Sequence, residues 1–391
     1  MTIVAAHIHP VWQLGFRPFF LVAGVFAAIA MVLWSGIWFG GWRLGAVAPV
    51  YWHAHEMIYG YALAVVAGFL LTAVRNWTGL PTPSGGMLAA LVACWLAARV
   101  ALLLSPDMLM AAAAFDLLFD CALLVAVARP IVRVRQWRQG GILAKLALIT
   151  TGNAVFYAGA LDGSVTGVFY GLYGGVLLLV ALILTMAGRV LPGFIERGVR
   201  RSVSIRDPRW ASAATLVLFL GFFVAEVALR DTHLVAFFAG GLAGITARRL
   251  VAWHTLALWR EPLLWGLYLA VVSIECGFLL YAAAPWWPVP RTLALHAFAA
   301  GGIGLATLAM MARVALGHTG RDIRKPPLAV GVALGLLATA VLTRVGLPLA
   351  LPPYYSVALA CSQALWIAAF VVFVAAYAPI LMRERVEDVP G

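Results

Sequence analysis

The chain has 391 residues, of which 64% are hydrophobic and only 11% charged, and its mean hydropathy is +0.98. Soluble domains carry about a quarter charged residues, so this composition excludes a soluble globular protein and indicates an integral membrane protein. The formal net charge of +12 could suggest a nucleic acid partner, but the cations lie in short segments between apolar runs, where they set membrane topology, and we exclude nucleic acid.

Apolar runs long enough to cross a bilayer recur along the whole chain. They predict an all-α, polytopic bundle of transmembrane helices that forms a single domain over residues 1–391, because the connections are too short for a soluble domain. Residues 1–15 lead into the first run without a small-residue cleavage site, so we expect a retained helix rather than a signal peptide. The twelve predicted spans are 16–39, 52–75, 86–104, 108–128, 142–161, 167–188, 210–229, 233–252, 263–283, 292–316, 328–347 and 355–381.

The arginines between the spans predict how the bundle is oriented. Arg133 follows the fourth span, Arg197 and Arg206 lie between the sixth and seventh, and Arg324 lies between the tenth and eleventh. All these connections fall on the same side, which the positive-inside rule makes cytoplasmic. We therefore expect both termini in the cytoplasm.

The second predicted span opens with WHAHE, which places His53, His55 and Glu56 near its outer end. Ionisable groups inside spanning helices are costly, and this makes them functional candidates. At about 100° per residue the two imidazoles point about 200° apart, so they cannot bind one metal from within a regular helix. Either the helix begins at Ala54 or later, or the histidines serve different sites. One haem and one copper would use both; the alternative is a pair of interfacial histidines bonded to backbone carbonyls.

The tenth span has the same layout as the second. Aligning His55 with His296 gives two segments of equal length that both end in Thr-Gly, which suggests a duplication. His296 is expected near the outer face. His318 is expected at the inner face, where it could be an axial haem ligand or could cap the helix. Three arginines expected on that face could pair with haem propionates, and they are Arg17, Arg313 and Arg321.

Other ionisable residues could support such a site. Glu56 could orient a ligand imidazole or relay protons, or it could be an interfacial carboxylate near a helix N-terminus. Asp116 and Asp120 lie one helical turn apart and could face Arg99, either as a structural ion pair or as a proton path. Glu275 could join the residues expected near the outer face, which are His53, His55, Glu56 and His296. The four cysteines fall inside apolar runs without a CxxC or CxxCH motif, so neither disulfides nor covalently attached haem is expected.

Several segments together carry a resemblance to a known family. They are GFRPFF at 15–20, WHAHEM at 52–57, GFLLTA at 68–73, NWTG at 76–79, PLLW at 262–265 and HAFAAGGIGLATLAMMARVALGHTGR at 296–321. With them the chain resembles the NnrS family, bacterial membrane proteins that contain haem and copper and are associated with denitrification and the response to nitric oxide. The resemblance implies an inner-membrane protein with haem b and copper that acts on or binds nitric oxide. Relatives usually have a histidine where this chain has Tyr268, so the chain would lack that ligand or use the tyrosine oxygen.

Three functions remain open from the sequence. The first is a metal-dependent nitric oxide response protein, which either turns the gas over or protects cellular iron. The second is a proton-coupled secondary transporter, suggested by helices rich in glycine and proline and by intramembrane carboxylates. The third is a nitric oxide reductase, which would need an external electron donor because the chain has no CxxCH motif and no cysteine cluster. The oligomeric state is left open.

Overall fold

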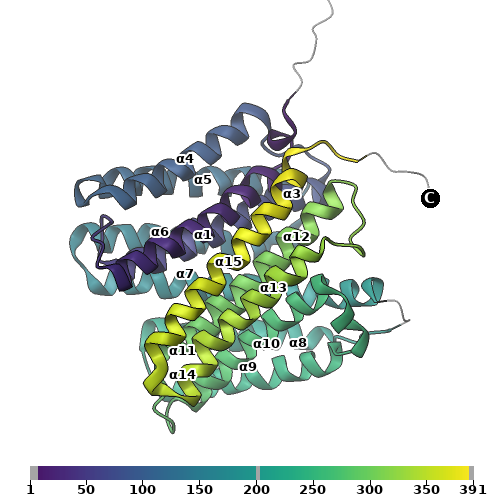
Figure 1. Ribbon diagram of the computed structural model, residues 1–391. Coiled ribbons are helices and arrows are strands. Elements are labelled where there is room, and N and C mark those ends of the chain that lie inside the picture. The colour runs from purple at the N-terminus through teal and green to yellow at the C-terminus, as the bar shows by residue number, and fades with distance from the viewer. Residues whose placement is uncertain (1–7, 200–202, 387–391) are drawn as a thin grey trace, which may run out of the picture.

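Helices make up nearly all of the chain that the computed structural model describes, residues 8–199 and 203–386. Twelve helical segments in these ranges are long and apolar enough to cross a membrane, as predicted, and they form one bundle (Figure 1). The spans built on one continuous helix are α1 (Phe16–Gly40), α4 (Gly85–Leu104), α5 (Leu109–Arg133), α6 (Gly140–Asp162), α7 (Val165–Gly198), α9 (Thr232–Trp253), α10 (Pro262–Ala283) and α15 (Tyr355–Met382).

The remaining four of these spans each contain a π-helical segment. The second span is α2 (Pro49–His55), η2 (Glu56–Ala62) and α3 (Leu63–Thr78), and the tenth is α11 (Arg291–His296), η7 (Ala297–Leu305) and α12 (Ala306–His318). The seventh is α8 (Arg209–Phe223) with η5 (Val224–Leu229), and the eleventh is α13 (Leu328–Val341), η8 (Leu342–Gly346) and α14 (Leu347–Ala350). A π-helical turn takes an extra residue, which rotates the side chains that follow it, and such turns are frequent at functional sites.

The second and tenth spans agree in backbone as well as in sequence layout. In both, the π-helical segment begins at the residue that follows the aligned histidine, His55 or His296. Both are also followed by a glycine in the left-handed region, Gly79 directly after α3 with φ 70° and Gly320 two residues after the end of α12 with φ 74°, a conformation that glycine adopts without steric cost. These shared features support the suggested duplication.

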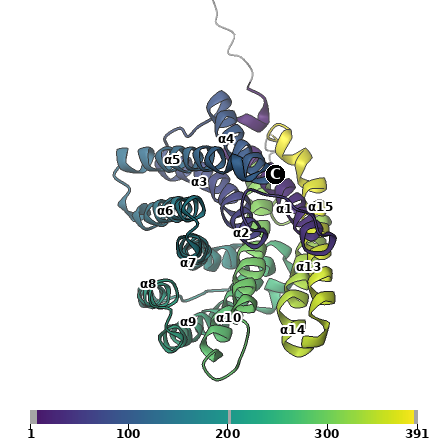
Figure 2. The ribbon, with the colours of Figure 1, turned by 90° about the vertical axis from the view of Figure 1, so that its left-hand side faces the viewer.

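The second, sixth and tenth spans pack on one another in the middle of the bundle. The long helix α7 contacts both η2 and η7, and α3 contacts α12; α2 and α7 lie toward the centre in Figure 2. Around them α1 packs on α15, α5 on α6 and α9 on α10. Polar groups on the three inner helices are therefore shielded from lipid by other helices, which is where intramembrane polar residues are tolerated.

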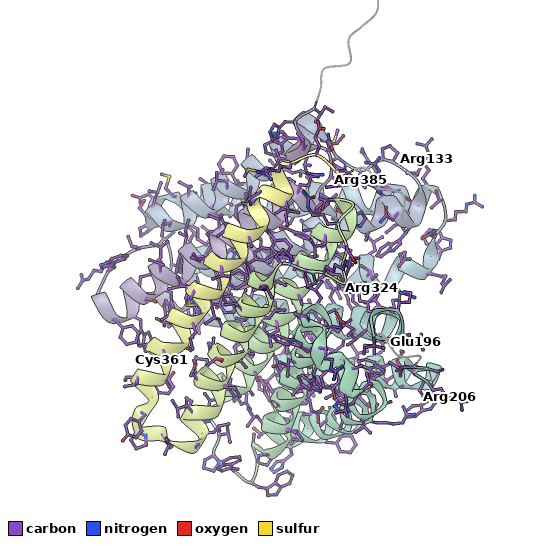
Figure 3. The ribbon with its side chains drawn as sticks, turned by 45° about the vertical axis from the view of Figure 1, so that its right-hand side comes forward. Arg133, Glu196, Arg206, Arg324, Cys361 and Arg385 are labelled. Atoms are coloured by element: carbon purple, nitrogen blue, oxygen red, sulfur yellow. The ribbon has the colours of Figure 1, made fainter. Side chains whose placement is uncertain are left out.

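The arginine-bearing connections lie on one side of the bundle, as the chain order predicts. Figure 3 shows Arg133, Arg206, Arg324 and Arg385 along the same side, while Cys361 lies at the other. We call the first the arginine-rich side and the second the opposite side. The first span begins near the arginine-rich side. Even-numbered spans therefore begin on the opposite side, and these include the second, which starts with α2, and the tenth, which starts with α11.

The helix α7 extends beyond its predicted span. It continues to Gly198, ten residues past the expected end at 188, and includes Pro192. The added residues carry Arg189 and Arg197, so they are too polar for a hydropathy pattern to mark although the backbone stays helical. The extension brings Arg197 to the arginine-rich side.

Candidate functional site

Two of the four candidate histidines come together on the opposite side. His53 of α2 and His296 of α11 are half-buried and lie near each other. His53 stacks on Trp34 of α1, with ring centroids 4.4 Å apart and an interplanar angle of 13°. The Nδ1–H of His296 donates to the Thr292 carbonyl at 2.6 Å, which leaves the Nε2 lone pair of His296 free. A backbone carbonyl on Nδ1 is a common partner of a metal-binding imidazole.

Arg344 adds a guanidinium to this pair, which the sequence analysis did not anticipate. It comes from η8 in the eleventh span, which packs on α11, and it is buried near both His53 and His296. Its guanidinium lies 5.6 Å from the Tyr355 ring centroid, and its Nη1 has no hydrogen-bond partner among the described residues. The signal was an arginine inside a predicted span. A buried guanidinium with a free donor suits a carboxylate or phosphate ligand.

His55 points into a separate and fully buried network. Its Nε2 lies 2.9 Å from Asn153 Oδ1, and Asn153 Nδ2 donates to Asp120 Oδ2 at 2.9 Å. Because the amide oxygen can only accept, His55 carries a proton on Nε2. Its Nδ1 lies 3.5 Å from Glu56 Oε1, and neither atom has a hydrogen-bond partner among the described residues. The helix begins at Pro49 and includes both histidines, which leaves the alternative of two different sites.

Arg99 is the one cation of this network among the described residues. Its Nη2 lies 2.5 Å from Asp116 Oδ2, so the expected ion pair is confirmed, and its Nη1 lies 3.4 Å from Glu56 Oε2. Tyr157 also donates to Asp116 Oδ2, at 3.0 Å. The network holds three carboxyl groups against one guanidinium. Burying that excess of negative charge is costly, so the network requires additional protons.

The predicted residues of the arginine-rich side lie in two different surroundings. Arg17 donates to the carbonyls of Leu381 and Arg383, at 2.9 and 2.5 Å, and so satisfies the C-terminal end of α15. His318 ends α12, and its ring centroid lies 5.6 Å from that of Phe16. Both contacts join α1 to the last residues of other spans. Their predicted roles toward haem stay predictions.

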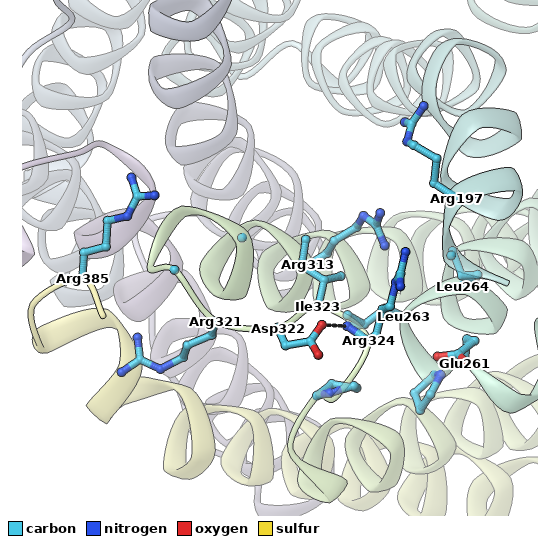
Figure 4. A pocket seen from close by; sticks show the side chains of 15 residues that line it. Arg197, Glu261, Leu263, Leu264, Arg313, Arg321, Asp322, Ile323, Arg324 and Arg385 are labelled. Carbon is cyan, nitrogen blue, oxygen red and sulfur yellow. Dashed lines mark hydrogen bonds between the residues drawn. The ribbon is translucent and has the colours of Figure 1, made fainter. Parts of the chain in front are cut away.

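Arg313 and Arg321 line a cavity of about 520 Å³ on the arginine-rich side (Figure 4). The guanidinium of Arg313 lies 3.9 Å from the ring centroid of Phe194 on α7. His318 is not among the residues that line this cavity, although it follows Gly317, which does line it.

The two remaining predicted residues lie on α10. Tyr268 donates to the Leu250 carbonyl at 3.0 Å and has its ring centroid 6.1 Å from that of His254, so its neighbours are on α9 and beyond rather than among the four candidate histidines. Glu275 is buried, and its Oε2 has no hydrogen-bond partner among the described residues.

The four candidate histidines are thus divided among three places: the His53–His296 pair, the His55 network and the end of α12. Within residues 8–199 and 203–386, no three or more His, Cys, Asp or Glu side chains are grouped so as to hold a metal ion. Sequence reasoning missed Asn153 and Tyr157 as well as Arg344. Their only signal was polarity inside an apolar helix, which many packing residues share.

The family model described as NnrS protein matches residues 10–385, nearly the whole chain, and so includes all the residues discussed above. A search of the curated proteins finds no match to the chain.

Proposed function

The chain belongs to the NnrS family, and from this we propose that it is a haem- and copper-binding protein of the bacterial inner membrane that acts in the response to nitric oxide. The observation that carries the proposal is the pairing of His53 and His296 beside Arg344. The family resemblance suggests the cofactors and the gas, and the pair offers a place for them. With the arginine-rich side in the cytoplasm, as the positive-inside rule favours, the pair would lie toward the periplasm.

The residues present fit a haem group. His296 has a free Nε2 lone pair, and the His53 ring makes no hydrogen bond within the described residues, so either imidazole can ligate iron. Arg344 has a donor to offer a propionate, and Trp34 offers an apolar aromatic face. Imidazole also suits copper, so a copper ion would compete for this pair or use His318. When bound, haem b would supply an iron that coordinates nitric oxide.

The chain's own residues would shape that chemistry. The half-buried setting of the pair restricts water, and Arg344 balances negative charge on a ligand. Reduction of nitric oxide would consume protons, and the His55 network, which begins two residues along α2, holds groups that can store them. Electrons would have to come from an external donor.

The experiment is a spectrum of the purified full-length protein in mild detergent, reduced minus oxidised, with copper analysis. We expect a haem signal that is lost in His53→Ala and in His296→Ala. We expect it to remain in His55→Ala, the matched control on the same helix, and in His318→Ala. Nitric oxide should shift the reduced spectrum of the native protein. Folded protein without haem or copper would refute the proposal.

A second candidate function, proton-coupled transport, is favoured by one observation: the excess of carboxyl groups around His55. Groups that must take up protons inside a membrane protein are typical of proton pathways in transporters. Uptake of a solute into liposomes, driven by a pH gradient and abolished by Asp120→Asn, would support it. Uptake that is absent in protein with stoichiometric haem would count against it.

A further inference from the structure

The cavity on the arginine-rich side carries an unbalanced positive charge. Five arginines line it, from α7, from α12 and the connection after it, and from the C-terminal segment, and they are Arg197, Arg313, Arg321, Arg324 and Arg385. Two carboxyl groups, those of Glu261 and Asp322, line it as well. Neither forms an ion pair with these arginines within the described residues, and Asp322 accepts instead from the backbone N–H of Arg324 at 2.8 Å.

Neighbouring groups hold two of these guanidiniums in place. Arg313 is packed over Phe194, and Arg321 Nη1 donates to the Thr319 carbonyl at 3.4 Å. Bringing like charges together is unfavourable unless an anion compensates them. Guanidinium matches carboxylate and phosphate oxygens through paired N–H donors, so the cavity has the chemistry of a site for such an anion.

A second, apolar cavity of about 90 Å³ lies deeper in the bundle on the same helices. Met310 lines it one turn of α12 away from Arg313, and Leu267 lines it one turn of α10 away from Leu264, which belongs to the arginine cavity. On α7, Val190 lines it two turns before Arg197. Residues three, four or seven apart lie on the same face of a helix. The two cavities therefore follow each other along one face of each of α7, α10 and α12.

We propose that the two cavities form one site for an anionic membrane lipid, independent of the haem and copper proposal. Its phosphate would lie among the arginines, and part of one acyl chain would lie in the apolar cavity. An amphiphile fits the order of the two linings, polar at the helix ends and apolar one to two turns inside. A free phosphate or a soluble carboxylate would use only the arginine cavity.

The test is native mass spectrometry of the full-length protein in neutral detergent, titrated with phosphatidylglycerol, with phosphatidylcholine, or with inorganic phosphate. We expect phosphatidylglycerol to bind most tightly. The variant Arg313→Gln/Arg321→Gln should weaken that binding at least about tenfold, the cost of one charge-assisted hydrogen bond. The control Arg133→Gln removes an exposed charge on the same side, outside the cavity, and should have no effect.

A second pair of variants tests the acyl chain. Ala187 lines the apolar cavity, so Ala187→Phe should fill it and weaken lipid binding, whereas Ala114→Phe, on an exposed position of α5, should not. Equal binding of both lipids would overturn the proposal. A second result would also overturn it: inorganic phosphate binds tightly, and Ala187→Phe changes neither phosphate binding nor lipid binding. The site would then take a free anion.

The haem content of the same samples separates this proposal from the previous one. Haem retained in Arg313→Gln/Arg321→Gln, with lipid binding weakened, supports the lipid site. If the double variant lost haem while its lipid binding stayed unchanged, these arginines would belong to the haem propionates, as the sequence suggests. That result would overturn the lipid-site proposal. If the double variant aggregates, Arg321→Gln alone, whose side chain is half-buried, gives the same comparison with a smaller loss.

Discussion

Replacing Arg99 by methionine should destabilise the protein through the buried network around His55. The guanidinium is 3% exposed and pairs with Asp116 at 2.5 Å and with Glu56 at 3.4 Å. Methionine keeps much of the volume but leaves three carboxyl groups without a cation. Removing one partner of a buried ion pair costs about 3–5 kcal/mol, because the other charge stays buried and uncompensated. We expect a loss of this size in the free energy of unfolding.

A second substitution on the partner residue should restore part of the loss. Asp116→Asn removes the stranded negative charge, and its amide oxygen can still accept from Tyr157. In the double variant Arg99→Met/Asp116→Asn we expect the two changes to be non-additive, with a coupling of about 1.5–3 kcal/mol. The assay is unfolding by SDS titration in mixed detergent micelles, for the native protein, both single variants and the double variant.

The matched control for Arg99→Met is Arg133→Met, which removes an exposed arginine at the end of α5. It should leave the unfolding midpoint unchanged. If Arg99→Met lost less than about 1 kcal/mol, or if the two substitutions simply added, the network would not depend on the guanidinium, and the reasoning from charge balance would be wrong.

Three further substitutions test how the spans are joined. Gly320→Ala should destabilise the protein by more than the roughly 1–2 kcal/mol expected for Gly79→Ala; both glycines have positive φ, but only at Gly320 would a methyl group collide with a backbone carbonyl. Tyr61→Phe should cost about 0.5–1.5 kcal/mol, because it removes the 2.5 Å hydrogen bond that Tyr61 donates to Thr307 between the second and tenth spans. Gly159→Leu should cost at least about 1–3 kcal/mol, because its side chain would overlap the backbone of α7.

The same SDS titration measures all three, and each has a matched comparison. Equal losses in Gly320→Ala and Gly79→Ala would contradict the proposed collision. Thr307→Val combined with Tyr61→Phe should lose little more than Tyr61→Phe alone, and full additivity would mean that the two hydroxyls are not coupled. Gly140→Leu adds the same side chain to the start of α6 where no atom lies within 4 Å, so it should unfold like the native protein.

The amino-acid sequence determined the architecture of the bundle closely. Each predicted span corresponds to a helix, because crossing a bilayer requires about 20 apolar residues with internally bonded backbone, and that requirement is local. The separation of His53 from His55 was also predictable, since the angle between residues two apart depends only on helix geometry. The arginine-bearing connections were also expected on one side, because successive spans cross the membrane in opposite directions and every second connection therefore lies on the same side.

Only the tertiary structure decided which polar side chains meet. His55 contacts Asn153 from α6, which in turn donates to Asp120 from α5, and His53 lies near Arg344 from a span almost three hundred residues away. The pattern of apolar residues does not encode which helix faces which, because every lipid-facing and protein-facing side is apolar alike. The π-helical turns that follow His55 and His296 add a rotation that periodicity does not reveal. The partners of a polar residue in a membrane are therefore set by helix packing, while the existence of the helices is set by composition.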